Sequence, residues 1–306
     1  MIGFLAKRFA TIPLVVLGVV TILFIIFKSV PGDEAAFVAG ATAPQAEIEA
    51  VRVQLGLDRP LLEQYAKHVS GLVVGDFGYS TTFRGNPLPH VLNRLPATLA
   101  LASAAILLTI VVGIPAGVVA AAYRNRLPDY LISLSVVGLL AIPNFWLGMI
   151  LIAWLSVGLG VLPSFGASGP ASLVIPTIAL AARLIALLAR MTRGVVIEEL
   201  RKDYVRTARA KGLSKGLALR RHVLRNVMIP TVTVIGLQAG YLLGGSVVIE
   251  RLFAWPGIGD LLLTAVSVRD YTLVQAIVLI FVVSFLVINI AVEVIYRFVN
   301  PRLRYA

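Results

Sequence analysis

Residues 95–123 read LPATLALASAAILLTIVVGIPAGVVAAAY and contain no Asp, Glu, Lys, Arg or His. A helix needs roughly 20 apolar residues to cross the hydrocarbon of a bilayer, where its backbone polar groups must be paired within the segment. This run is therefore long enough for one membrane span. The whole chain has the same character, because 58% of its 306 residues are hydrophobic and only 14% are charged, against about 25% charged in soluble domains. The sequence predicts an all-α integral membrane protein.

Further apolar runs set the number of spans. Residues 9–27, 227–249 and 271–292 are also free of charge, and each is long enough for one crossing. Residues 130–182 lack ionisable Asp, Glu, Lys, Arg and His but are too long for one crossing. They contain VGLGVLPSFGASGPAS at 157–172, a cluster typical of a chain reversal. We predict two spans there, the second ending near Arg190, and six transmembrane helices in all.

Basic residues predict the orientation, because Lys and Arg are retained in the cytoplasmic loops of membrane proteins. If the N-terminus is inside, the inside loops hold Arg124, Arg126 and eleven basic residues between positions 190 and 225, whereas the turn at 158–171 has none. Both termini are therefore predicted to be cytoplasmic, in a multi-pass protein of the plasma (inner) membrane. The net charge of +12 reflects this topology, and we expect no nucleic-acid partner.

We expect three regions: an N-terminal transmembrane helix at 1–30, an extracytoplasmic helical loop at 31–94, and a five-helix core at 95–306. In the large outer loop, Thr42 with Gln45 resembles a capping box, and Pro60 marks a second helix start. The pattern is equally compatible with a docking surface or gate and with a cap on the membrane surface.

The densest charge follows the fourth span, in a segment at about 198–225 that includes DYVRTARAKGLS at 203–214. Leu200, Tyr204 and Ala208 are spaced by four, which predicts a narrow apolar stripe on a cationic helix. Gly212 suits a helix stop, and Ser214 could cap a second short helix. We predict a helix-turn-helix elbow. By composition it could lie on anionic lipid or fit a groove of a cytoplasmic partner.

Catalytic motifs are missing from the sequence. It has no Gly-x-x-x-x-Gly-Lys-Ser/Thr phosphate loop, no His-Glu-x-x-His and no cluster of metal ligands. The GIGD at 257–260 resembles a motif of intramembrane aspartyl proteases, but no second Asp lies inside a predicted span. We therefore expect no enzyme activity, and neither a metal nor a cofactor bound by this chain.

Arg183 lies near the middle of the fourth span, where an Arg costs roughly 2.5–3.5 kcal/mol on insertion scales. It should face a cavity, a partner helix or a counter-charge. We treat it as a candidate for the substrate path, the alternative being packing against carbonyls or a partner's acid. An ion-coupled transporter or a channel would predict paired ionisable residues within spans, or an inverted repeat. The sequence shows neither.

Other polar and small residues in the spans are weaker candidates. Asn144 follows Pro143, where a simple kink also explains the pair. Gln238 and Tyr241 could line a pore. They flank a stripe of small residues that suits close helix packing, made of Gly236, Gly240 and Gly244.

The elbow sequence, followed by RRHVLRNVMIPTVTVIGLQ at 220–238, closely resembles ABC importer permeases of the dipeptide and oligopeptide (peptide/nickel) group. The resemblance extends to GGSVVIERLFAWPGIG (244–259), VRDYTLVQ (268–275), LGLDRPLLEQY (55–65), GDFGYS (75–80) and the ending VNPRLRY (299–305). In the broader permease motif, Glu-Ala-Ala precedes a Gly. Here Arg206 stands at the Glu position, which looks like the peptide-permease version.

This resemblance implies a type I ABC importer permease fold. It also implies four kinds of partner: a second homologous permease, two cytoplasmic ATPase subunits that hold ATP and Mg, an extracytoplasmic binding protein, and the lipid membrane. The elbow would be the coupling helix for the ATPases, through Tyr204, Arg206, Thr207, Ala208, Arg209, Ala210, Lys211, Gly212 and Leu213. The implied cargo is di- or oligopeptides, with nickel complexes, glutathione or another small solute as alternatives.

Overall fold

The computed structural model describes residues 2–40 and 42–299, so the VNPRLRY ending lies outside the described residues from Asn300 onward. The described chain is helical, apart from turns, loops and an isolated bridge between Ser80 and Gly85. It forms two compact units. The first combines the residues up to Arg94 with 261–284, and the second combines 95–260 with the residues from Phe285 onward.

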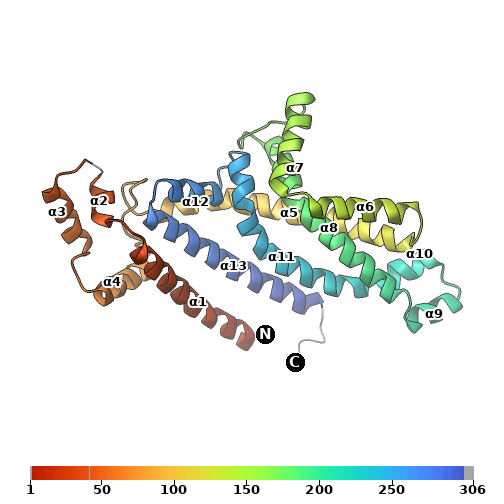
Figure 1. Cartoon of the computed structure of the whole chain (residues 1–306). Coiled ribbons are helices and arrows are strands. Elements are labelled where there is room, and N and C mark those ends of the chain that lie inside the picture. The colour runs from red at the N-terminus through yellow and green to blue at the C-terminus, as the bar shows by residue number, and fades with distance from the viewer. Residues whose placement is uncertain (1, 41, 300–306) are drawn as a thin grey trace. The chain divides into compact units, whose positions relative to one another are not determined.

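The helices follow one another along the chain as labelled in Figure 1. Their bounds are α1 (Ile2–Ser29), α2 (Glu34–Ala39), α3 (Gln45–Leu55), α4 (Leu61–Val73), α5 (Leu88–Ala122), α6 (Leu127–Ala141), α7 (Asn144–Leu151), the π-helix η1 (Ile152–Gly158), the 3-10 turn η2 (Pro170–Leu173), α8 (Val174–Glu199), α9 (Asp203–Ala210), α10 (Lys215–Ala218), the π-helix η3 (Leu219–Val223), α11 (Leu224–Leu252), α12 (Ile258–Ser267) and α13 (Tyr271–Val299).

Five of these stretches are long and apolar enough to cross a membrane: Arg8–Ser29, Leu88–Ala122, Pro170–Glu199, Pro230–Leu252 and Tyr271–Val294. A sixth consists of Leu127–Ala141 and Asn144–Gly158, which are bent by 106° relative to each other (Figure 1). The predicted six spans are thus present if the bent pair counts as one. The sequence predicted only a simple kink at Pro143, and the bend is larger than that. Ile142 is extended because it precedes Pro143, so the helix ends and a new one begins at Asn144.

Helix α8 is the centre of the second unit and its most buried span. It contacts α6, α7 and α11, and many of its buried positions are alanine. Helix α5 approaches α8 closely at two glycines. A Cβ on Gly117 would meet Ala189 O at 2.5 Å and Thr192 Cβ at 2.6 Å. Small residues at such contacts allow two helix backbones to pack closely in a membrane.

An ion pair ties α6 to α8. Arg193 donates from Nε and Nη2 to the two carboxylate oxygens of Asp129, at 2.6 and 2.7 Å, and Asp129 also accepts the Asn125 amide at 2.9 Å. Asp129 is buried. Planar, bidentate pairing of this kind is among the stronger hydrogen-bonded contacts in proteins, and it fixes geometry as well as charge.

The ERLFAWPGIG segment folds around one buried carboxylate in the second unit. Glu250 is fully buried and accepts hydrogen bonds from Ser246 Oγ at 3.0 Å and from the amides of Gly259 and Asp260 at 2.7 and 3.2 Å. A Cβ on Gly257 would collide with this carboxylate. The glycines of GIGD therefore make room for Glu250, which gives this motif a structural role.

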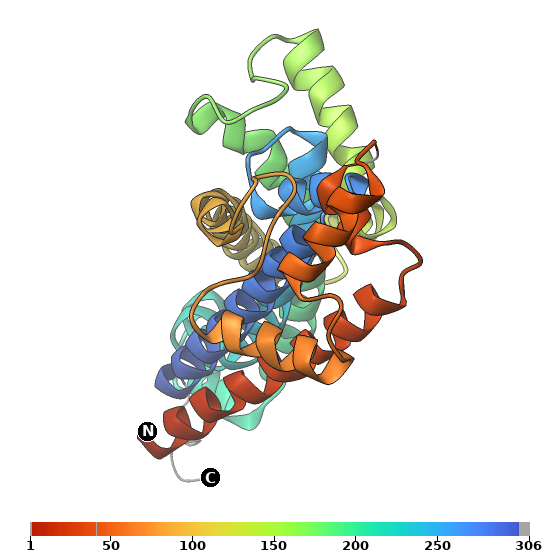
Figure 2. The same cartoon turned by 90° about the vertical axis from the view of Figure 1, so that its left-hand side faces the viewer.

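The first unit contains α1, the segment between α1 and α5, and the N-terminal part of α13 (Figure 2). Helix α4 begins after Pro60 as predicted, but the Thr42 capping box was wrong. Helix α3 begins at Gln45 and its N-cap residue is Pro44, so Thr42 lies too far upstream to cap it. Helix α1 packs on α4, where Thr21 Oγ1 and Tyr65 OH share a 2.7 Å hydrogen bond.

Two motifs of the first unit, 190 residues apart, meet at Asp270. Its Oδ2 accepts Ser80 Oγ at 2.6 Å and the Thr82 amide at 2.9 Å, while Oδ1 accepts the Leu273 amide at 3.0 Å and so caps α13. Burial raises the pKa of Asp270, but the lowering by these hydrogen bonds is larger. The net pKa therefore lies below the ordinary value. Asp270 anchors the GDFGYS loop to the start of α13.

Candidate functional site

The predicted helix-turn-helix elbow is present. Helix α9 ends at Ala210, and Gly212 follows with φ of 91°, a left-handed conformation that favours glycine. Ser214 caps α10 as expected, because its Oγ accepts the Leu217 amide at 3.4 Å. Helix α10 continues through η3 into α11. The elbow thus sits between the ends of two long helices, α8 and α11.

Val205 is the buried anchor of α9, with 1% of its surface exposed. It packs against residues of four other α-helices and of the π-helix η3, namely Ala121, Val196, Ala218, Val223 and Val227. The predicted stripe of Leu200, Tyr204 and Ala208 was wrong. Helix α9 begins only at Asp203, so Leu200 precedes it, and Tyr204 is 36% exposed.

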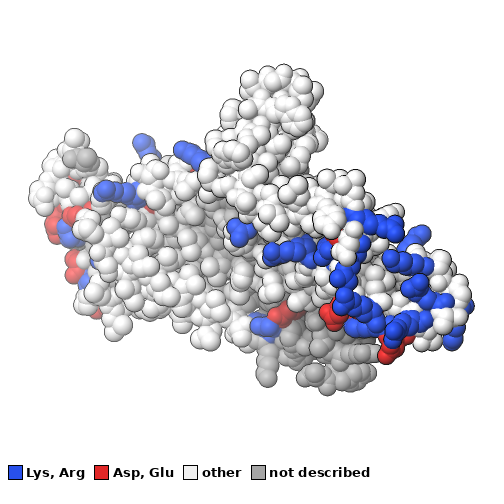
Figure 3. All heavy atoms as spheres, turned by 45° about the vertical axis from the view of Figure 1, so that its right-hand side comes forward, with Lys and Arg blue, Asp and Glu red and all other residues white. Residues whose placement is uncertain are grey.

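The remaining elbow residues form an exposed basic surface. Figure 3 shows Lys and Arg side chains gathered over this end of the second unit. The exposed positions of the predicted coupling set are Tyr204, Arg206, Thr207, Arg209, Ala210, Lys211 and Gly212, and the half-buried ones are Ala208 and Leu213. Arg206 makes one contact with Asp203, at 3.5 Å and in full solvent. Such an exposed pair contributes little to stability, so this surface is accessible for a partner.

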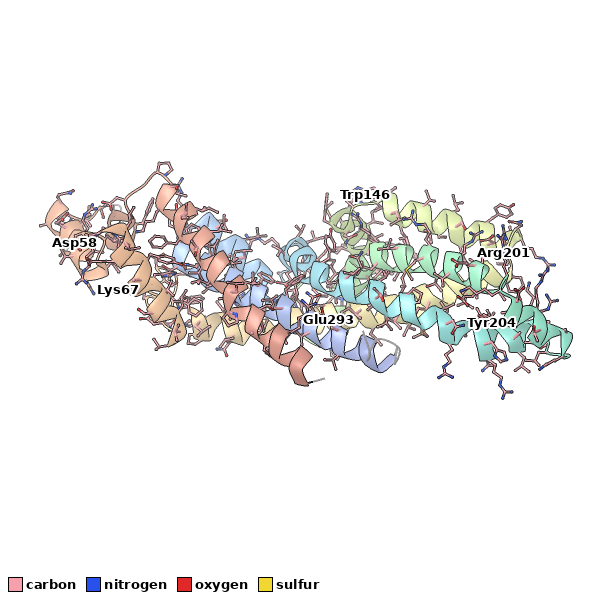
Figure 4. The ribbon with its side chains drawn as sticks, turned by 90° about the horizontal axis from the view of Figure 1, so that it is seen from below. Asp58, Lys67, Trp146, Arg201, Tyr204 and Glu293 are labelled. Atoms are coloured by element: carbon pink, nitrogen blue, oxygen red, sulfur yellow. The ribbon has the colours of Figure 1, made fainter. Side chains whose placement is uncertain are left out.

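A hydrogen-bond network that the sequence did not predict lies at the base of the elbow. Tyr204 OH donates to Glu199 Oε2 at 2.5 Å, Asn226 Nδ2 lies 3.1 Å from Tyr204 OH and 3.3 Å from Glu199 Oε2, and Lys202 forms an ion pair with Glu199. Burial and the neighbouring Glu199 carboxylate raise the pKa of Tyr204. Hydrogen bonding to the same carboxylate raises the pKa of Lys202. Figure 4 labels Tyr204 at the elbow.

The four candidates for the substrate path lie on three helices. Arg183 is exposed although its neighbours on α8 are buried, so it faces away from the core of this chain. Gln238 lines a narrow apolar cavity of about 10 Å³ with Leu184 and residues of α5. That volume is roughly the space that one water needs. Tyr241 is exposed on α11, and Asn144 is the first residue of α7.

Two of the three glycines of the stripe on α11 are closely packed, and the third is not. A Cβ on Gly236 would collide with the side chain of Val292, and one on Gly240 with the ring of Phe285. Both neighbours lie on α13. A Cβ on Gly244 would meet nothing within 4 Å. Within this chain the close approach therefore involves two of the three glycines, and Gly244 is exposed.

The sequence matches known protein families over nearly its whole length. Residues 113–305 match the family described as "binding-protein-dependent transport system inner membrane component", and residues 1–102 match the N-terminal domain of such membrane components. The chain belongs to this permease family. It is therefore a multi-pass membrane component of an importer. The expectation that it is not itself an enzyme is confirmed, since these permeases leave ATP hydrolysis to separate subunits.

Close relatives agree over the full length. The permease is 42% identical over 305 residues to the glutathione transport system permease protein GsiC of Escherichia coli K12, and covers all of both chains. The corresponding protein of Shigella flexneri is also 42% identical, again with full coverage. The solved inward-facing MetNI methionine ABC transporter matches with a TM-score of 0.60 and 22% identity, over 71% of this chain and 99% of that one. This likeness supports the predicted type I importer fold.

The first unit of the permease contains a cavity of about 720 Å³. It lies between the end of α1, helix α4, the loop before α5 and the start of α13. Its wall includes Lys28, Lys67, His68, Arg269 and Tyr271. The described residues contain no group of three or more His, Cys, Asp or Glu that could hold a metal ion.

Proposed function

We propose that this permease is the membrane-spanning subunit of an ATP-driven importer of short peptides. It would work with a second homologous permease, two cytoplasmic ATPase subunits that hold ATP and Mg, and an extracytoplasmic binding protein. The observation that carries the proposal is the elbow, an exposed basic helix and turn on the surface of a chain that belongs to the binding-protein-dependent permeases.

The elbow is the proposed docking element for an ATPase subunit. Its exposed face runs from Arg206 to Gly212, while Val205 holds the opposite face to the core. A helix that is fixed on one side and accessible on the other suits insertion into a groove of a partner. This assignment requires the elbow and both termini to be cytoplasmic, as the basic residues predict.

The proposed cargo class is short peptides, including the tripeptide glutathione. Two observations support it: the resemblance of the elbow and its flanking motifs to peptide permeases, and the 42% identity to glutathione permeases. Arg183, exposed between buried neighbours on α8, would suit a peptide carboxylate. The cavity of the first unit lies in the proposed outer segment, where a binding protein would dock.

The test is uptake by proteoliposomes that contain the permease with its cognate second permease and ATPases, supplied with the binding protein. Labelled glutathione, a dipeptide, a pentapeptide and a nickel complex are offered in parallel. We expect uptake of one or more peptides, dependent on both ATP and the binding protein. Selective nickel uptake would overturn the peptide assignment. Uptake driven by an ion gradient without ATPases would overturn the importer assignment.

A further inference from the structure

The carboxylate of Glu199 lies where three helices meet. Glu199 is the last residue of α8, Tyr204 is in the first turn of α9, and Asn226 is in the first turn of α11. Both Tyr204 OH and Asn226 Nδ2 bond to Glu199 Oε2, at 2.5 and 3.3 Å, and Lys202 binds the other oxygen. We call these four residues the elbow latch.

Burying the charge of Glu199 would cost free energy unless these partners were present. Glu199 is buried, with only 8% of the residue exposed, and a buried charge needs partners to replace water. A negative charge at the C-terminal end of its own helix is also unfavourable, whereas the first turn of α9 favours an anion. The same carboxylate therefore holds all three helix ends in one arrangement.

We propose that Glu199 is a positioning residue for coupling, because the elbow latch transmits a displacement of α9 to both α8 and α11. This inference rests on the proposed function. Without the latch, α9 is connected to α8 by a short turn and held to the core mainly by Val205. Helices α8 and α11 pack against each other and together line the cavity beside Gln238. Movement of the elbow would then shift this pair as one body.

The test compares latch variants in the reconstituted importer, with uptake and ATP hydrolysis measured in the same vesicles. Tyr204→Phe removes one hydroxyl and Glu199→Ala removes the carboxylate, whereas Glu199→Gln keeps an acceptor for Tyr204. Glu198→Gln is the matched control, because Glu198 is the adjacent residue but exposed. The readout is the number of substrate molecules taken up per ATP hydrolysed, which a loss of folded protein alone would leave unchanged.

We expect this ratio to fall about tenfold in Tyr204→Phe and more in Glu199→Ala, consistent with the loss of a hydrogen bond to a charged group. Glu199→Gln should lie between Glu199→Ala and the wild type, and Glu198→Gln should match the wild type. The double variant Tyr204→Phe/Glu199→Ala should lose less than the product of the two single losses, because both single changes remove the hydrogen bond between Tyr204 and Glu199.

A wild-type ratio in Tyr204→Phe and Glu199→Ala would overturn the latch. Failure of the proposed function gives a different result. The chain has no Cys, so a cysteine introduced at Thr207 can report ATPase contact by cross-linking. If wild-type uptake needs no ATP and Thr207→Cys does not cross-link to an ATPase, the proposed function fails whatever the latch does. If uptake needs ATP and Thr207→Cys does cross-link to an ATPase, but the latch variants still show the wild-type ratio, only the latch proposal is refuted.

Discussion

Replacing Gly117 with alanine tests the close packing of α5 on α8. The new Cβ would lie 2.5 Å from Ala189 O, 2.6 Å from Thr192 Cβ and 3.0 Å from Arg193 N. Carbon atoms in contact are normally about 3.5–4.0 Å apart. Two of the three clashing atoms belong to backbone, so a change of rotamer cannot relieve them. The two helices would have to separate by about 1 Å, judged against that contact distance.

The expected cost follows from two opposing effects. Overpacking of a close contact costs about 1–3 kcal/mol, while alanine in place of glycine inside a helix gains roughly 0.5–1 kcal/mol. Gly117→Ala should therefore be destabilising on balance. Gly113→Ala should be milder, because its closest contact is 3.2 Å, and Gly18→Ala should stabilise slightly, because nothing lies within 4 Å of its Cβ.

The assay is thermal denaturation of the detergent-solubilised permease, followed by size-exclusion chromatography of a fluorescent fusion. We expect the Tm to rank Gly18→Ala highest, then Gly113→Ala, then Gly117→Ala, with the last a few degrees below the wild type at about 2–4 °C per kcal/mol. A Tm of Gly117→Ala equal to or above that of Gly18→Ala would refute the packing argument.

Three further predictions concern other parts of the chain. The folded pKa of Asp270 is lowered, so its attachment of the GDFGYS loop should persist at neutral pH and be lost only as the pH falls below about 4. Loss of hydrogen-exchange protection at the Thr82 amide between pH 7 and 5 would contradict this. Gly257→Ala should lower the Tm, because overpacking against Glu250 costs about 1–3 kcal/mol of stability. An unchanged Tm would count against the structural role of GIGD. Arg183→Leu should raise the Tm, because it removes a charge that costs roughly 2.5–3.5 kcal/mol in a span, and should impair uptake; unchanged uptake would assign Arg183 to packing alone.

The sequence predicted the spans well because hydrocarbon imposes a simple rule on length and charge. The elbow was also predictable, since Gly212 and Ser214 are local signals that act within a few residues. The sharp break before Asn144 was underestimated. A proline in a span is compatible with a mild kink or a complete break, and the neighbouring helices decide between them.

The contacts that were missed join residues far apart in the sequence. Ser80 and Asp270 are 190 residues apart, and Glu199 and Asn226 are separated by the whole elbow. Periodicity reports which face of a helix is apolar, but not which charged residue a distant helix will meet. For the same reason the apolar spacing of Tyr204 concealed its hydroxyl, which is the group that joins the latch.

The most direct test of the account is substrate-stimulated ATP hydrolysis by the reconstituted importer with Gly212→Pro. Proline fixes φ near −65°, whereas Gly212 has φ of 91° and donates its amide to Arg209 O at 3.0 Å, so the elbow turn cannot form. The matched control is Gly216→Ala, at an exposed position with open space around it.

We expect Gly212→Pro to insert in the membrane but to lose stimulated hydrolysis and uptake, while Gly216→Ala behaves as the wild type. Stimulated hydrolysis and uptake at wild-type rates in Gly212→Pro would contradict the assignment of this elbow as the coupling element.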